Sequence, residues 1–224
     1  MVKTAYVKNG GPGCGKGTDA KVIAQELGLP KPFEMGPFLL ERRKKDAELN
    51  AEMERTTDQG LYVSDRFLLP ILAEQLDNGL PNEFIADGIT RTREQTEMVL
   101  QKLRARGYRV VTLNYDVPPE RDDVFYERMK IRNRAGETRL VQQNRVATFR
   151  KHNPGVIDVF KSWPHHFCRD VDGTLEHPDR CQVIRVIIRD APGSRPIRRG
   201  LVTERPLLDQ TGGPAQRPEF CSER

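Results

Sequence analysis

Apolar and polar positions change period several times along the chain, and each change marks a different secondary-structure element. Residues 2–8 alternate as a strand does. Over residues 16–27 the apolar positions recur every three or four residues, which predicts an amphipathic helix that Gly28 ends. The same patterns predict further strands at 33–34, 84–86, 108–115 and 166–171, and helices at 37–58, 65–77, 92–106, 118–132, 140–151, 154–161 and 178–189.

Strands and helices alternate in this order, which is typical of a parallel sheet flanked by helices. We therefore predict an α/β fold of three layers around a five-stranded parallel sheet, within one domain over residues 1–190. The composition changes after Asp190, because residues 191–224 are rich in Pro, Gly and Arg. This segment is predicted to be a loosely packed tail.

The composition excludes several classes of protein. Of the 224 residues, 37% are hydrophobic and 31% are charged, as in a globular protein. No stretch approaches the roughly 18 apolar residues of a membrane-spanning helix, and the first residues indicate a strand rather than a signal sequence. We therefore expect no membrane partner and no cleaved leader. The four cysteines are scattered without a C-x-x-C pair, which argues against a zinc site and favours a reducing compartment, the cytoplasm.

A net charge of +5 suits a protein that binds polyphosphates or nucleic acid, and one segment favours polyphosphates. Residues Gly10 to Thr18 contain G-x-x-x-x-G-K between a predicted strand and a predicted helix, the context that this motif requires. The glycines let backbone N–H groups face an anion, and Lys16 adds a charge that reaches the β- and γ-phosphates. The residues predicted to bind ATP are Gly11, Pro12, Gly13, Cys14, Gly15, Lys16, Gly17 and Thr18.

The whole loop, G-x-P-G-x-G-K-G-T, resembles the phosphate loop of the adenylate kinase family and its UMP/CMP kinase relatives. Residues 60–65, GLYVSD, are similar to the family's G-x-L-V-x-D, and residues 87–92, DGITRT, to its D-G-F-P-R-T. Arg128, Arg132 and the segment 171–173 also match, so the resemblance covers about residues 3–189. It implies a P-loop kinase fold with a small helical NMP-binding insert at about 35–65 and a very short lid at about 132–142.

Phosphoryl transfer requires positioning and neutralised charge rather than a covalent nucleophile. The resemblance implies catalytic roles for Lys16, Arg91, Arg128, Arg132, Arg134 and Arg145. It also implies that Arg128 contacts the donor phosphates and that Asp87 holds Mg²⁺ through water. Arg134 precedes Arg145 by the eleven residues that the family uses, but the lid is so short that Arg139 is a rival for its role. Because the lid has no cysteine, it is not the zinc-bearing variety.

The acceptor side departs from the family. The family's T-G-D-x-L-R falls on Met35 to Leu40, so a leucine replaces the arginine that contacts the acceptor phosphate. Arg43 either substitutes for that arginine or belongs to a solvated basic face. Gln95, four residues after Arg91, suits the edge of adenine because a carboxamide both donates and accepts. The predicted acceptor-binding residues are Met35, Gly36, Tyr62, Val63, Gly88, Arg91 and Gln95.

We predict an adenylate kinase that catalyses ATP + AMP ⇌ 2 ADP with Mg²⁺, as a cytoplasmic monomer without a nucleic-acid partner. One alternative is a kinase for UMP, CMP or dAMP. Another is a nucleotide-binding sensor or interaction module that has lost turnover, and a nucleic-acid-binding role is the remotest. His165, His166 and His177 lack carboxylate or cysteine partners at metal-ligand spacing in the sequence, so we predict that they bind no metal.

Overall fold

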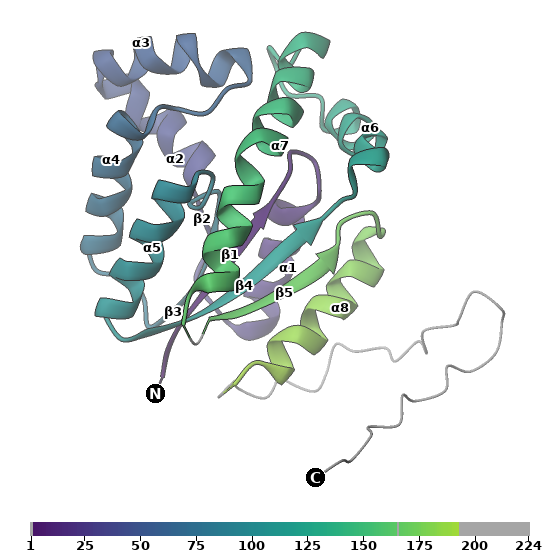
Figure 1. Ribbon diagram of the computed structural model, residues 1–224. Helices are drawn as coiled ribbons and strands as arrows, with labels where there is room; N and C mark the ends of the chain where they lie inside the picture. The colour runs from purple at the N-terminus through teal and green to yellow at the C-terminus, as the bar shows by residue number, and fades with distance from the viewer. Residues whose placement is uncertain (1, 165, 193–224) are drawn as a thin grey trace, which may run out of the picture.

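The computed structural model describes residues 2–164 and 166–192, which fold into three layers (Figure 1). The middle layer is a five-stranded parallel sheet in the order β2-β3-β1-β4-β5. Its strands are β1 (Lys3–Gly10), β2 (Phe33–Glu34), β3 (Glu83–Asp87), β4 (Tyr108–Asp116) and β5 (Phe167–Asp172). The α-helices are α1 (Lys16–Leu27), α2 (Met35–Arg42), α3 (Ala47–Arg55), α4 (Asp65–Asp77), α5 (Arg93–Ala105), α6 (Asp122–Arg132), α7 (Arg139–Ser162) and α8 (His177–Asp190). The predicted fold class is confirmed.

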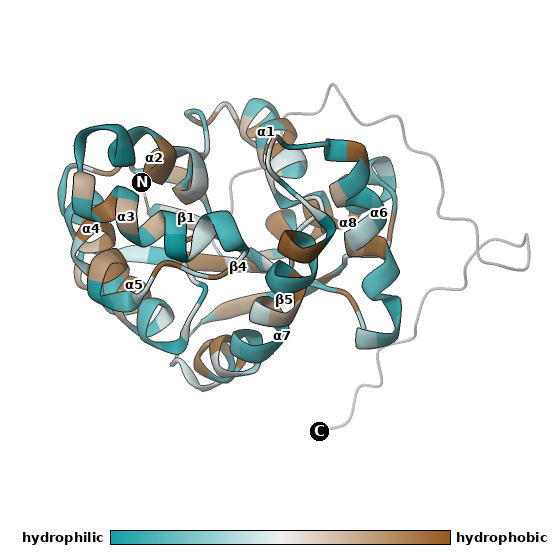
Figure 2. Cartoon of the chain, turned by 90° about the horizontal axis from the view of Figure 1, so that it is seen from above, coloured by the Kyte–Doolittle hydropathy of each residue, from teal (hydrophilic) through white to brown (hydrophobic). Residues whose placement is uncertain are grey.

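Each face of the sheet packs on its own set of helices. Ala5 and Val7 of β1 belong to a core formed with α2 to α5 and the second half of α7. Tyr6, which points the other way, belongs to a core formed with α1, α6, α8 and the first half of α7. In Figure 2 polar and apolar residues both occur on the labelled helices, as expected of helices with one buried and one exposed side. No helix in the described ranges is long and apolar enough to cross a membrane.

All five strands end at the same edge of the sheet. In the register of the sheet, Lys8 of β1 lies beside Asp87 of β3, and Asp87 lies beside Glu34 of β2. The phosphate loop leaves β1 at this edge, directly after Gly10. Parallel α/β sheets bind ligands at the carboxyl ends of their strands, so this edge is where a site is expected.

The segment predicted as one helix over 37–58 is divided in two. Helix α2 ends at Arg42, a 3₁₀ turn covers Arg43–Lys45, and α3 begins after Asp46. The Asp46 carboxylate accepts a hydrogen bond from the backbone N–H of Leu49 at 2.9 Å, which is an N-cap that starts a new helix. Because charged residues run through the whole segment, the sequence pattern did not reveal this cap.

A second predicted helix boundary, between residues 151 and 154, is also wrong. The sequence predicts separate helices at 140–151 and 154–161, whereas the structure has one helix with Pro154 inside it. Proline removes one intrahelical hydrogen bond. The side chains of Phe149, before Pro154, and Val156, after it, are buried in the two apolar cores, and this packing favours a continuous helix. Of the predicted tail, residues 193–224 lie outside the described residues.

Candidate active site

The phosphate loop joins β1 to α1 and has the backbone that anion binding requires. Gly13 and Gly15 have φ angles of 80° and 96°, which favour glycine. A Cβ on Gly15 would overlap the Arg180 guanidinium, and one on Gly11 would overlap the Phe125 ring. Gly15 is the N-cap of α1 and forms no side-chain cap hydrogen bond, so the first N–H groups of α1 are available to an anion.

Lys16 lies against this loop. Its Nζ donates hydrogen bonds to the carbonyl oxygens of Gly10 at 2.6 Å and Gly11 at 2.8 Å, and it lies 3.4 Å from Cys14 Sγ. The ammonium group is therefore held beside the same backbone that would surround a phosphate. Cys14 is fully buried, whereas Thr18 is exposed on the first turn of α1. The structure thus brings together the loop residues that the sequence predicted for ATP.

Two carboxylates converge on the start of α1. A Cβ on Gly17 would lie 3.9 Å from Asp87 Oδ2 and 3.9 Å from Glu34 Oε2. Asp87 Oδ1 is a buried atom with no hydrogen-bond partner in the described part of the chain. An orphaned carboxylate oxygen beside a phosphate loop fits a Mg²⁺ ion and its water ligands. Asp87 was predicted for this role from the sequence and Glu34 was not, although its position at the end of a short strand was a usable signal.

Arginines surround one buried carboxylate in the segment that the sequence predicts as the lid. Glu137 has a side chain that is 2% exposed, and its Oε1 lies 2.7 Å from Arg132 Nη2 and 2.8 Å from Arg145 Nη1. Burial and then the charge of Arg132 lower the pKa of Arg134. Burial also lowers the pKa of Arg145, to which the positive charges of Arg132, Arg134 and Arg91 contribute. Four of the predicted catalytic arginines therefore lie close enough to affect one another.

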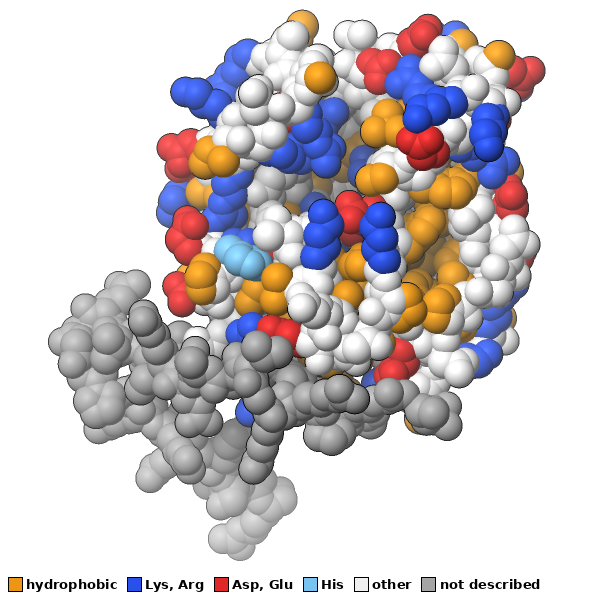
Figure 3. All heavy atoms as spheres, turned by 180° about the vertical axis from the view of Figure 1, so that it is seen from behind, with side chains coloured by type: hydrophobic (Ala, Val, Ile, Leu, Met, Phe, Trp, Pro, Cys, Tyr) orange, Lys and Arg blue, Asp and Glu red, His pale blue; other side chains and the backbone are white. Residues whose placement is uncertain are grey.

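The rival lid residue is placed elsewhere. Arg139 is exposed, and its guanidinium stacks on the ring of Tyr126 at 4.0 Å from the centroid. Arg134 is also exposed, but it lies near the charges of Arg132, Glu137 and Arg91. The geometry therefore favours Arg134 over Arg139. Figure 3 shows a face of the molecule that is hollowed near its upper end, with Lys and Arg side chains along the hollow.

Arg91 lies beside a cavity that extends toward α7. Its guanidinium carbon is 5.3 Å from the centroid of the Tyr62 ring, and the Tyr62 and His152 rings are 5.5 Å apart. A Cβ on Gly88 would lie 3.0 Å from Arg91 Nη2, so the glycine gives the arginine room. Burial raises the pKa of Tyr62, and Arg91 partly opposes this shift. The cavity has a volume of about 390 Å³, and its lining includes Tyr62, Val63, Asp65, Thr92 and His152.

Gln95 is fully buried and bound by protein groups at both ends of its carboxamide. Its Nε2 donates to Asp65 Oδ1 at 2.7 Å, and its Oε1 accepts from the backbone N–H of Arg91 at 3.0 Å. Contact with an adenine edge would require it to exchange one of these bonds. Met35, also predicted for the acceptor, is 1% exposed within the apolar core, while Gly36 has open space around its Cα.

Two further arginines, Arg128 and Arg43, donate hydrogen bonds to other groups of the protein. The Arg128 guanidinium donates to the carbonyl oxygens of Gly173, Thr174 and Leu175 at 2.6, 3.0 and 2.8 Å, so it anchors α6 to the turn after β5. The structure does not place it with the other predicted catalytic arginines.

Arg43 forms a bidentate pair with Asp58, with both distances 2.9 Å, and donates to Asn50 at 2.7 Å. It is therefore neither part of a solvated basic face nor free to replace the arginine that the family has at Leu40. Leu40 itself is 47% exposed.

Comparisons with known proteins agree with this geometry. The adenylate kinase family model matches residues 9–165. The adenylate kinase of Mycobacterium tuberculosis is 30% identical over 154 residues, which are 68% of this chain and 83% of that protein. Adenylate kinase 1 of a Nostoc species is 30% identical over 161 residues, covering 70% and 84%. The adenylate kinase of a Synechococcus species is 29% identical over 170 residues, covering 75% and 90%. Motifs, sheet order and these matches together show that the chain belongs to the adenylate kinase family of nucleoside monophosphate kinases.

Proposed function

We propose that the chain transfers the γ-phosphoryl group of ATP to AMP with Mg²⁺. The observation that carries the proposal is the gathering, at one edge of the sheet, of the phosphate loop, a carboxylate pair and a group of arginines. Phosphoryl transfer needs these three elements and no covalent nucleophile. The relatives named adenylate kinase support AMP as the acceptor.

Each element has a distinct task in this proposal. The loop amides and Lys16 bind the donor phosphates, and the N-terminus of α1 adds a favourable dipole. Glu34 and Asp87 would hold Mg²⁺, which supplies positive charge to the phosphate oxygens when bound. Arg91 orients the acceptor phosphate, because a guanidinium matches two phosphate oxygens at once. Arg132, Arg134 and Arg145 then stabilise the negative charge that develops between donor and acceptor.

The NMP-binding insert at about 35–65 and the lid at about 132–142 form the movable parts of this proposal. Glu137 holds Arg132 and Arg145 in one orientation, so a lid that closes delivers the arginines together. Closure also excludes water, which limits hydrolysis of ATP. A monomeric state and a cytoplasmic location stay predictions.

The test is a panel of monophosphates in a coupled assay with ATP and Mg²⁺, using the whole chain. AMP is expected to react fastest, and Lys16→Ala is expected to lower kcat/KM by about a hundredfold or more. Lys21→Ala on the exposed side of α1 is the matched control and should leave the rate unchanged. A faster reaction with UMP or CMP than with AMP would exclude the adenine assignment.

A second candidate function is a nucleotide-binding module without turnover. Its support is that Gln95 is already bound to Asp65 and that Arg43, paired with Asp58, does not replace the arginine missing at Leu40. The same panel separates the two functions. ATP binding in a calorimeter without transfer to any monophosphate would favour the module.

A further inference from the structure

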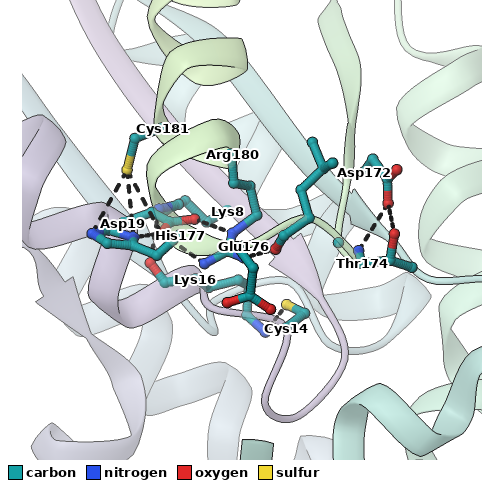
Figure 4. Close-up of polar contacts among 12 residues, drawn as sticks. Lys8, Cys14, Lys16, Asp19, Asp172, Thr174, Glu176, His177, Arg180 and Cys181 are labelled. Carbon is teal, nitrogen blue, oxygen red and sulfur yellow. Dashed lines mark hydrogen bonds and ion pairs between the residues drawn. The ribbon is translucent and has the colours of Figure 1, made fainter. Parts of the chain in front are cut away.

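A cluster of potential metal ligands lies behind the phosphate loop, where the first turn of α8 meets α1 (Figure 4). Asp19 Oδ1 is 2.7 Å from His177 Nδ1. Cys181 Sγ is 3.5 Å from His177 Nδ1 and 3.8 Å from Asp19 Oδ1. One carboxylate oxygen, one imidazole nitrogen and one thiol sulfur therefore share a space only a few ångströms across.

This cluster corrects the expectation that His177 has no partners of metal-ligand type. His177 and Cys181 are four residues apart on α8 and so lie on the same side of the helix. Asp19 comes from α1, 158 positions earlier in the chain, and only the packing of α1 on α8 brings it to them. Neither cysteine spacing nor histidine spacing in the sequence reveals such a site.

The three spacings suit a tetrahedral ion. Zinc bonds of about 2.0 Å to nitrogen or oxygen and about 2.3 Å to sulfur place neighbouring ligands about 3.3–3.6 Å apart. The sulfur–nitrogen and sulfur–oxygen distances, 3.5 and 3.8 Å, are already near this range. The nitrogen–oxygen distance of 2.7 Å is a hydrogen bond, which an ion would open by roughly 0.6 Å. A small change in the His177 side chain is sufficient for this.

A second set of contacts orients the carboxylate. Arg180 Nε donates to Asp19 Oδ2 at 2.7 Å, and Arg180 Nη2 donates to Asp19 Oδ1 at 3.0 Å. Both side chains are almost fully buried, so the Asp19 rotamer is held in place. Metal-binding carboxylates are commonly fixed by such hydrogen bonds.

The charge around the cluster must also allow a cation. Asp19 and an ionised Cys181 supply two negative charges, against the positive charges of Arg180 and Lys8. Burial lowers the pKa of Lys8 to about 8, so this lysine gives up its proton more readily than an exposed one. A zinc-type ion binds the thiolate form of cysteine, so it must displace the Cys181 thiol proton when it binds.

We propose that Asp19, His177 and Cys181 bind a zinc-type divalent cation, with a fourth position left for water. His177 has a side chain that is 39% exposed, which gives the ion a route from solvent. Bound there, the ion cross-links α8 to the first turn of α1, which directly follows the phosphate loop. The ion stabilises the position of the phosphate loop through α1, and it takes no part in the chemical step.

The test is a titration of the whole chain with Co²⁺, a spectroscopic substitute for zinc. Binding to Cys181 is expected to produce a strong sulfur-to-cobalt charge-transfer absorption that added Zn²⁺ removes. Cys181→Ser should abolish this absorption, and His177→Ala should weaken the affinity by about a hundredfold or more. Cys168→Ser, which changes a partly buried cysteine on β5, is the matched control and should leave both unchanged.

Co²⁺ held only by Glu34 and Asp87 would give no such absorption, because those ligands are oxygens. A melting curve with and without Zn²⁺ provides an independent measurement, since an ion that binds the folded state raises Tm. The rise is expected in the unaltered chain and not in Cys181→Ser. No sulfur-to-cobalt band in the unaltered chain, or an equal band in Cys181→Ser, would overturn the proposal.

Discussion

The arrangement of Arg132 and Arg145 depends on Glu137, and Glu137→Gln tests this dependence. The substitution keeps the size of the side chain and removes its charge. It leaves Arg132 and Arg145 facing each other without the carboxylate that lies 2.7 and 2.8 Å from them. Glu137 is 2% exposed, whereas the two arginines are 31% and 25% exposed. Water therefore compensates part of the lost interaction.

The expected magnitude follows from these exposures. Breaking a fully buried ion pair costs about 3–5 kcal/mol, and a charged hydrogen bond contributes about 1.5–3 kcal/mol. Partial solvation of both arginines lowers the estimate for Glu137→Gln to about 2–3 kcal/mol of unfolding free energy. For a chain of this length, such a loss lowers Tm by about 5–10 °C. We also expect kcat to fall by about ten- to a hundredfold, because the arginines lose their common orientation.

The assay is urea unfolding followed by circular dichroism, combined with initial rates in the coupled assay. The matched control is Glu97→Gln, which removes an exposed pair with Arg93 at 3.5 Å and should cost at most about 0.5 kcal/mol. Equal stability losses in the two variants would refute the reasoning. So would a normal kcat in Glu137→Gln.

Three further predictions follow from other parts of the chain. Glu34→Gln should weaken the binding of Mn²⁺, measured by electron paramagnetic resonance with ATP present, by about tenfold, whereas Glu41→Gln on exposed α2 should not. Lys8→Met should increase the unfolding free energy at pH 7 by about 1–3 kcal/mol. Because the pKa of Lys8 is lowered to about 8, the unfolded chain binds more protons between there and the ordinary lysine value, so stability rises with pH across that window. Lys8→Met should flatten this rise in urea titrations at several pH values, and an unchanged slope would contradict the assignment. Pro154→Ala should stabilise α7 by about 1 kcal/mol or more in thermal unfolding, because it restores a backbone donor inside the helix, and a loss of stability would contradict this account.

The sequence by itself determined the fold class and the place of the phosphate loop between the first strand and the first helix. The strand at 2–8, the glycine loop and the helix at 16–27 follow one another without a gap, and their geometry is set by local rules. Helix boundaries at 65–77 and the short strand at 33–34 were predicted as the structure has them. These features depend on residues close together in the chain, which is why a sequence pattern contains them.

Tertiary packing decided the rest, because it joins positions that no local pattern connects. Pro154 predicts a helix end, whereas the burial of Phe149 and Val156 in the two apolar cores favours a continuous α7. Glu34 lies beside Asp87 because β2 pairs with β3 in this register.

The arginines show the same division. The family resemblance implied a catalytic role for Arg128, Arg132, Arg134 and Arg145 alike. In the structure, Arg128 donates to the turn after β5, whereas Arg132 and Arg145 both contact Glu137. The cluster of Asp19, His177 and Cys181 exists only because α1 packs on α8. A sequence specifies which side chains are available, whereas their distances in space depend on how the helices cover the sheet.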